Sequence, residues 1–139
     1  MHPLTKQAIE RDIRLAEGVF GAGAVFWPPS LAWLRINGYK LPCIYNRQHT
    51  DIIIRIPPHY GLINVPLEEF YLDEGLRLWN KNNWTKIPHY HEGKYLNAFT
   101  EKYWVWFCLH PRSWKTSDNI LTFIKLVDLM FQDPMNWNP

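Results

Sequence analysis

Cys108 is the residue whose type and surroundings best fit covalent chemistry. It ends an apolar run and precedes a proline-containing turn over residues 109–114. The thiolate is the reactive form of cysteine, and nearby positive charge promotes it. His110, Arg112 and the N-terminus of a following helix could supply that charge. The alternative is a buried strand cysteine, because cysteine is among the commonest interior residues.

His110 lies two residues after Cys108. In an extended strand, residues i and i+2 share a face, so the two side chains could meet. A cysteine and a histidine on one face form a candidate nucleophile and base. A solvated histidine at the end of a strand is the alternative interpretation. Cys43 has only a structural interpretation.

His89 and His91 repeat the i, i+2 spacing. With Cys108 and His110 they give four possible zinc ligands, since zinc binds thiolate and imidazole. Neither half has a zinc-finger spacing, so two polar loop histidines are the alternative. No glycine-rich phosphate loop, nucleophile elbow or carboxylate pair is evident, and no cofactor is expected.

Two helices are expected to frame these residues. Apolar residues at helical spacing predict a first helix over Leu4–Glu17. A second, largely buried helix is predicted over Asp118–Phe131, with Asp118 among the candidate N-caps.

Several short extended segments are expected between the helices. Asn37-Gly38 is a hairpin signal that would join two strands. The polar stretch Gly75–Tyr95 is expected to be a long loop. The order predicts an α+β fold with helices packed on an antiparallel sheet. The strands are expected at Leu31–Ile36, Tyr39–Tyr45, Asp51–Ile56, Phe70–Leu72 and Tyr103–Leu109.

Length and composition predict a single domain over residues 1–139. Trp, Tyr and Phe make up 16% of the chain, which argues against disorder. A net charge of +2 without a basic run gives no support for a nucleic-acid partner. Gly18–Leu34 is uncharged but contains Pro28-Pro29, so we expect a loop and a strand rather than a membrane span. With two cysteines and no signal-peptide core, a cytoplasmic protein is expected.

The aromatic residues are expected mainly to fill the core. Trp79 and Trp84, in the polar loop, form the one plausible pair for stacking on a ligand.

The segment around Cys108 resembles the active-site stretch of ubiquitin-conjugating E2 enzymes. In that stretch a Cys-Leu pair precedes a turn, a Trp, a polar cap and a long apolar helix. These features correspond here to Cys108-Leu109, Trp114, Asp118-Asn119 and the helix that follows. Upstream, the run from Ile53 through Pro57-Pro58 and Tyr60 to Pro66 resembles the strand and Pro/Tyr turn of that family.

The sequence also departs from that pattern. Gly61 follows Tyr60 where the eukaryotic enzymes usually have Pro, and Ala98-Phe99-Thr100 replaces a His-Pro-Asn motif. Asn97, nearby but out of register, is the candidate for stabilising an oxyanion. The family's usual C-terminal helices are missing, so a contact surface is expected on the second helix. This pattern is similar to prokaryotic E2-like proteins that carry a histidine just after the cysteine, as His110 does here.

The resemblance implies a UBC-like fold with an N-terminal helix, a four-stranded antiparallel meander, an active-site loop and one long C-terminal helix. It also implies transthiolation: Cys108 would accept a ubiquitin-like modifier from an E1-like enzyme and pass it to an amine of a target protein. His110 could lower the pKa of Cys108, orient the acceptor or stabilise the oxyanion, for which Asn97 is a further candidate. Asp118 could help to desolvate an incoming lysine, although capping is its preferred role. Such E2-like proteins are similar to components of bacterial ubiquitin-like conjugation operons, some of which act in anti-phage defence. The alternatives are an inactive E2-like binding scaffold and a small zinc protein using His89, His91, Cys108 and His110.

Overall fold

The computed structural model describes residues 1–88 and 104–137, together with the backbone of residues 91–95. Two α-helices and eight strands follow one another along the described chain. Neither helix in this part of the protein has the length and apolar character that crossing a membrane requires. The elements are α1 (Pro3–Phe20), a 3-10 turn (Ala22–Ala24), β1 (Val25–Phe26), β2 (Trp33–Lys40), β3 (His49–Arg55), β4 (Glu69–Asp73), β5 (Leu78–Asn80), β6 (Asn83–Thr85), β7 (His91–Tyr95), β8 (Trp104–Cys108) and α2 (Ile120–Gln132).

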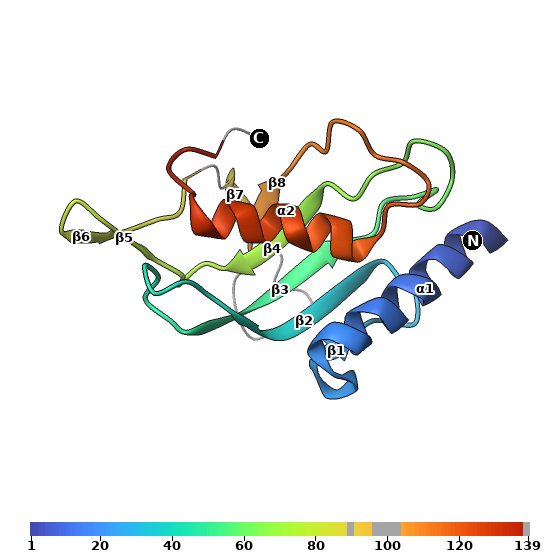
Figure 1. The fold of residues 1–139 in the computed structure, drawn as a ribbon, viewed down its shortest axis with the longest axis horizontal. Helices are drawn as coiled ribbons and strands as arrows, with labels where there is room; N and C mark the ends of the chain where they lie inside the picture. Colours follow the sequence, from blue (N-terminus) through green and yellow to red (C-terminus); the bar gives the residue numbers. More distant parts are fainter. Residues whose placement is uncertain (89–90, 96–103, 138–139) are drawn as a thin grey trace.

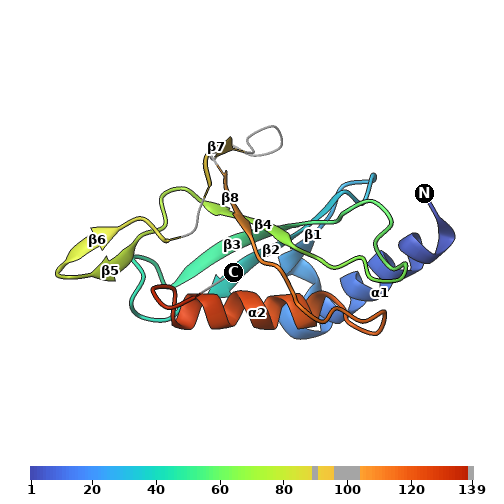
Figure 2. The same ribbon diagram turned by 90° about the horizontal axis from the view of Figure 1, so that it is seen from above.

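The main sheet is antiparallel, with the strand order β1-β2-β3-β4-β8-β7. Both helices lie on one face of it (Figures 1 and 2). The α+β class is therefore confirmed. The predicted four-stranded meander has fewer strands than the observed sheet. Strands β2, β3, β4 and β8 form its centre, and β1 and β7 extend its two edges. The connection from β4 to β8 also leaves the sheet and returns, so the order is not a simple meander.

The predicted hairpin at Asn37-Gly38 is wrong. Strand β2 continues through both residues to Lys40, and its register with β3 shifts between Ile36 and Tyr39. Gly38 has φ 74°, a left-handed conformation that glycine adopts readily and that suits a bulge. The chain reverses later, in residues 41–48, where Leu41 donates to the Gln48 carbonyl. The predicted return strand over Tyr39–Tyr45 is therefore also wrong.

The core lies between the helices and the sheet. Ile9 and Ala16 of α1 and Phe123 of α2 are completely buried. Phe123 meets Phe70 of β4 edge-on, and Phe70 stacks on Phe107 of β8. These contacts fix α2 beside the end of β8. Leu129, on the outer side of α2, is 48% exposed, but most residues of the helix are buried or half-buried, as predicted.

Asn119, rather than Asp118, caps α2. Its side chain accepts hydrogen bonds from the backbone N–H groups of Leu121 and Thr122, and the Thr122 hydroxyl accepts one from the Asn119 N–H. This reciprocal arrangement is a capping box. The Asp118 carboxylate instead accepts from the Lys115 N–H, closing the preceding turn. The helix therefore begins two residues later than predicted.

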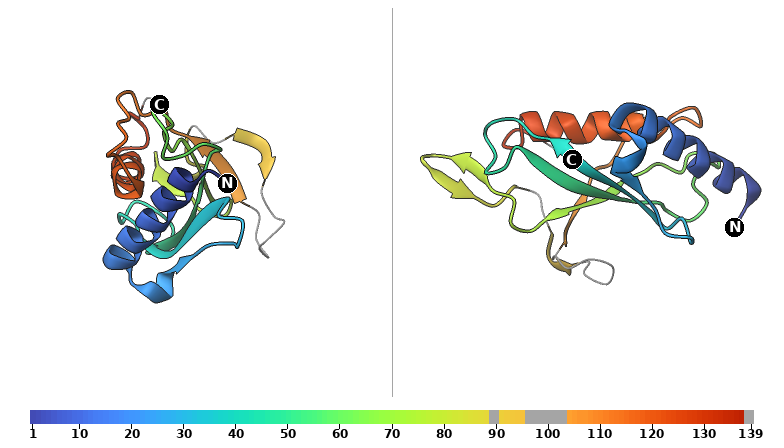
Figure 3. Two further views of the ribbon diagram at one scale, coloured as in Figure 1. Left: turned by 90° about the vertical axis from the view of Figure 1, so that its right-hand side faces the viewer. Right: turned by 90° about the horizontal axis from the view of Figure 1, so that it is seen from below.

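Part of the predicted long loop folds as the β5–β6 hairpin, which extends away from the sheet (Figure 3). Lys81 and Asn82 both have positive φ, as a two-residue type I′ turn requires. Trp79 and Trp84 face each other across the strands with ring centroids 5.0 Å apart and an interplanar angle of 68°. They are 47% and 46% exposed, as expected of an aromatic pair outside the core.

Candidate functional site

Cys108 is the last residue of β8 and lies directly opposite Glu69 of β4. Its neighbour Phe107 stacks in the core, so the pleat directs the Cys108 side chain to the sheet face opposite the helices. The Leu109 N–H donates to the Glu68 carbonyl at 2.7 Å, which continues the pairing one residue past the strand. The thiol is therefore partly exposed on a rigid strand end.

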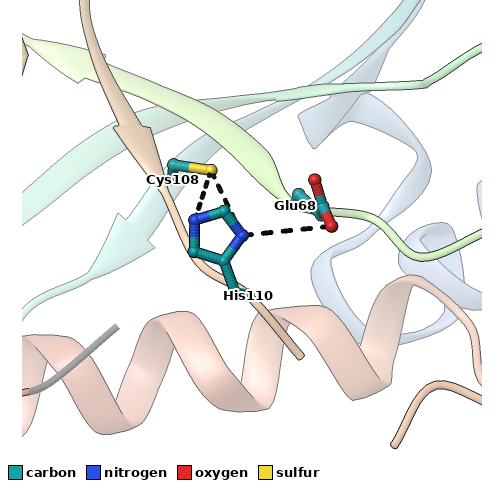
Figure 4. Close-up of side chains that lie close together, drawn as sticks. All are labelled: Glu68, Cys108 and His110. Carbon is teal, nitrogen blue, oxygen red and sulfur yellow. Dashed lines mark hydrogen bonds and ion pairs between the residues drawn. The ribbon is translucent and has the colours of Figure 1, made fainter. Parts of the chain in front are cut away.

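His110 and Glu68 complete a small cluster with the thiol (Figure 4). The Cys108 Sγ atom lies 3.4 Å from Nε2 of His110 and 3.9 Å from Nδ1. Nδ1 lies 4.0 Å from Oε1 of Glu68. The i, i+2 geometry predicted for Cys108 and His110 is thus present. The imidazole therefore lies between the thiol and the Glu68 carboxylate, within reach of the thiol proton.

The electrostatic surroundings of Cys108 differ from the sequence prediction. Burial raises the pKa of the thiol to about 11, and the charges of Glu68 and Glu69 act in the same direction. Positive charge was expected to favour the thiolate. Among the described residues, the charges that raise the pKa of this thiol are carboxylates instead, so the resting side chain is a thiol. Attack on a carbonyl therefore requires a base that takes the proton during the reaction, and the imidazole of His110 lies at that place.

A hollow of about 160 Å³ lies beside the two carboxylates. Arg55 of β3 forms part of its wall and donates to Oε2 of Glu69 at 2.6 Å. The ion pair partly neutralises Glu69 and leaves Glu68 as the freer negative charge. The other lining residues are Pro57 and Pro66.

A second hollow, of about 350 Å³, begins at His110 and runs along the segment that follows it. Leu126 of α2 and Trp137 form its far side, so it is more apolar than the first. The lining from the connecting segment is Leu109, His110, Pro111, Arg112 and Ser113. The Cys108 and His110 pair therefore has an acidic hollow near one side and a more apolar one near the other.

A buried polar network joins α1 to the segment that follows the site. Asp12 is completely buried, accepts from the Tyr60 hydroxyl at 2.5 Å and accepts from Nε of Arg11 at 3.0 Å. It also accepts from the Ile120 N–H at the start of α2. Burial raises the pKa of the Asp12 carboxyl, and these hydrogen bonds oppose that rise. Arg11 further donates to the Asp118 carbonyl.

Gly61, next to Tyr60, is required by the packing of α1. Its φ is +89°, and a Cβ built there would lie 2.6 Å from the Ala8 Cβ. Proline holds φ near −65°, so it could not adopt this conformation. The departure at this position from the usual eukaryotic E2 residue thus has a local reason: the Tyr60 turn lies directly against α1.

Several predicted site residues cannot be placed. Asn97 and His89 lie outside the described residues. His91 is described only through its backbone, which pairs with Trp106 of β8. The proposed zinc set of His89, His91, Cys108 and His110 therefore stays a prediction. Cys43 is exposed in the β2–β3 connection and belongs to no such cluster among the described residues.

Sequence reasoning missed Glu68, Glu69 and Asp12. The two glutamates are about forty residues from Cys108 and become neighbours only through the β4–β8 pairing. No local motif indicates that contact. Asp12 did carry a signal, because it interrupts the apolar positions Ala8 and Ala16 on one helix face. A carboxylate at such a position predicts a buried polar partner.

Residues 25–133 match the family described as prokaryotic E2 family E, and the chain belongs to that family. The resemblance to prokaryotic E2-like proteins is thereby confirmed. Membership suggests a conjugating role and, in general terms, interaction with an E1-like enzyme and a modifier. Comparison with curated proteins gave no match, and comparison with solved structures gave none either.

Proposed function

We propose that this protein carries a ubiquitin-like modifier as a thioester on Cys108 and transfers it to an amine of a target protein. The observation that carries the proposal is the 3.4 Å contact between Cys108 Sγ and His110 Nε2 at an accessible strand end. Membership of an E2 family supplies the reaction class. Action in anti-phage defence belongs to the same proposal, through the operon context that the resemblance implies.

In the first step, Nε2 of His110 takes the thiol proton as Sγ attacks the modifier's thioester carbonyl carbon. A bond forms between Sγ and that carbon, and the bond to the activating enzyme's sulfur breaks. That sulfur leaves as a thiolate and takes up a proton. Glu68 stabilises the imidazolium formed in between. Asn97 is the proposed donor to the tetrahedral oxyanion, by its place in the sequence.

In the second step, a target amine attacks the carbonyl carbon of the Cys108 thioester. An amide bond forms, the carbon–sulfur bond breaks, and the sulfur is reprotonated as the amine loses a proton. Glu68 and Glu69 would attract a lysine ammonium to the acidic hollow, where it must lose a proton before attacking. The apolar hollow beside His110 would hold the end of the modifier.

The high thiol pKa has a consequence for the proposed intermediate. A sulfur whose thiol has a high pKa is a poor leaving group, so a thioester on Cys108 would react slowly with water and weak nucleophiles. Protonation of the leaving sulfur by His110 would then accelerate transfer when an amine is bound. The site would in this way hold the modifier until a target arrives.

The test mixes the protein with its cognate activating enzyme, modifier and ATP, followed by electrophoresis without reductant. We expect an adduct that disappears on adding thiol, is absent from Cys108→Ala and persists in Cys43→Ala. Each variant removes one cysteine sulfur from the chain, so Cys43→Ala is the matched control for Cys108→Ala. An adduct on Cys108→Ala would overturn the site. Binding of modifier without any adduct would favour the inactive scaffold instead.

A further inference from the structure

We propose that Glu68, Cys108 and His110 form a binding site for a single Zn²⁺ ion. Each residue offers one ligand atom: a carboxylate oxygen, a sulfur or a ring nitrogen. These three atoms lie within 4.8 Å of one another. This site differs from the four-residue set predicted from the sequence, because it uses a glutamate that only the β4–β8 pairing brings near. It requires neither His89 nor His91.

The spacing suits a tetrahedral ion. Typical zinc–ligand bond lengths place neighbouring ligand atoms about 3.4–3.6 Å apart around a tetrahedron. Here Nδ1 of His110 lies 3.9 Å from Sγ of Cys108 and 4.0 Å from Oε1 of Glu68. Small side-chain rotations would close these gaps. Both moving side chains have room to rotate, because His110 is 62% exposed and Glu68 is 44% exposed.

The donor set also suits the ion chemically. Thiolate, imidazole and carboxylate are the three protein donors that zinc uses. Zn²⁺ would bind the sulfur as thiolate, releasing the thiol proton to solvent, and the two anionic ligands would balance the charge of the ion. Three protein ligands leave a fourth position for water. His110 and Glu68 are accessible, so an ion can enter without opening the fold.

Metal binding would regulate the site described above, and this consequence rests on the proposed function. A sulfur bonded to zinc donates an electron pair to the ion and no longer has His110 as its base, so its attack on a thioester would be slowed. Zinc would therefore hold the protein unloaded, and a stronger chelator would release it. The metal site itself is independent of any conjugation activity.

The experiment titrates the full-length, metal-free protein with Co²⁺, which reports coordination through its absorption spectrum, and then with Zn²⁺ in competition. We expect one metal per chain and a thiolate-to-cobalt charge-transfer band that Zn²⁺ abolishes. Cys108→Ser should lose the band. Glu68→Gln and His110→Ala should weaken binding by at least about 10-fold, the lower range for removing even an outer-shell partner.

Matched controls separate the site from general surface binding. Glu69→Gln removes a neighbouring carboxylate that is bonded to Arg55, and Cys43→Ser removes the other cysteine. Both should bind metal as the wild type does. A band that survives in Cys108→Ser, wild-type affinity in Glu68→Gln, or no band at all would each overturn the site. An adduct assay in chelator tests the conjugation proposal separately, since no metal is present there.

Discussion

The Sγ atom of Cys108 lies 3.4 Å from Nε2 of His110, two residues further along the chain. The contact arises because the pleat of β8 continues past the strand end and returns His110 to the face that carries the thiol. Glu68, the residue just before β4, approaches the other ring nitrogen. The pair is thus set by one strand and supported by its neighbour.

His110→Ala should slow loading of Cys108 by about 10²–10⁴-fold, the usual contribution of a positioned general base. The measurement is the single-turnover rate from a charged activating enzyme. His49→Ala, which removes an exposed histidine at the start of β3, should leave that rate unchanged. Equal rates in His110→Ala and wild type would contradict the role of the imidazole.

The thiol of Cys108 should titrate with a midpoint near the pKa of about 11. Burial and two carboxylates raise this pKa. The reactive thiolate is therefore lost at a higher pH than for an ordinary cysteine. Glu68→Gln removes one of those charges, so its midpoint should be lower and its alkylation at pH 9 faster. The measurement is iodoacetamide alkylation against pH in a Cys43→Ala background with chelator present. A wild-type midpoint below the ordinary cysteine value would contradict this electrostatic description.

Asp12→Ala should lower the free energy of unfolding, because each buried donor left without its acceptor costs about 1–3 kcal/mol. The substitution leaves the Tyr60 hydroxyl and the Ile120 N–H without their buried acceptor. Denaturant unfolding of each variant measures the change. Glu10→Ala is the control, because it removes a carboxylate two residues earlier in α1 that forms an exposed ion pair with Lys6 at 4.0 Å. This variant should change the free energy of unfolding by less than about 0.5 kcal/mol. Similar losses in the two variants would contradict the importance of the buried network.

Gly61→Ala should destabilise the protein by about 1–3 kcal/mol, because the residue is held at positive φ and the new methyl group overlaps the Ala8 side chain. Gly18→Ala is the matched control. Gly18 lies inside α1, and a Cβ there has nothing within 4 Å. That variant should gain about 0.5–1 kcal/mol from higher helix propensity. Thermal or denaturant unfolding that ranks the two in the opposite order would exclude this explanation of Gly61.

Much of the architecture follows from local sequence patterns. The apolar periodicity around Ile9 and Ile13 predicts α1, and the apolar run before Cys108 predicts β8. The hairpin predicted at Asn37-Gly38 was wrong because this dipeptide suits a bulge as well as a hairpin turn. Which of the two forms depends on the pairing of β2 with β3. The β5–β6 hairpin was missed because its strands are only three residues long, too short to show an alternating pattern.

The candidate site likewise has one part that local sequence predicts and one part that it does not. Cys108 and His110 are two residues apart, so their contact follows from strand geometry alone. The acidic surroundings of the thiol do not, since Glu68 and Glu69 reach it through long-range pairing. For that reason the sequence suggested a thiolate promoted by Arg112 and a helix terminus, whereas the folded chain holds a thiol beside carboxylates.

The most direct test of the central claim is the intact mass of the protein after reaction with its activating enzyme, modifier and ATP, followed by peptide mapping. We expect a mass increase equal to the modifier less one water, located on the peptide that contains Cys108 and reversed by a small thiol. A modifier attached elsewhere, or resistant to thiol on the wild-type chain, would contradict it.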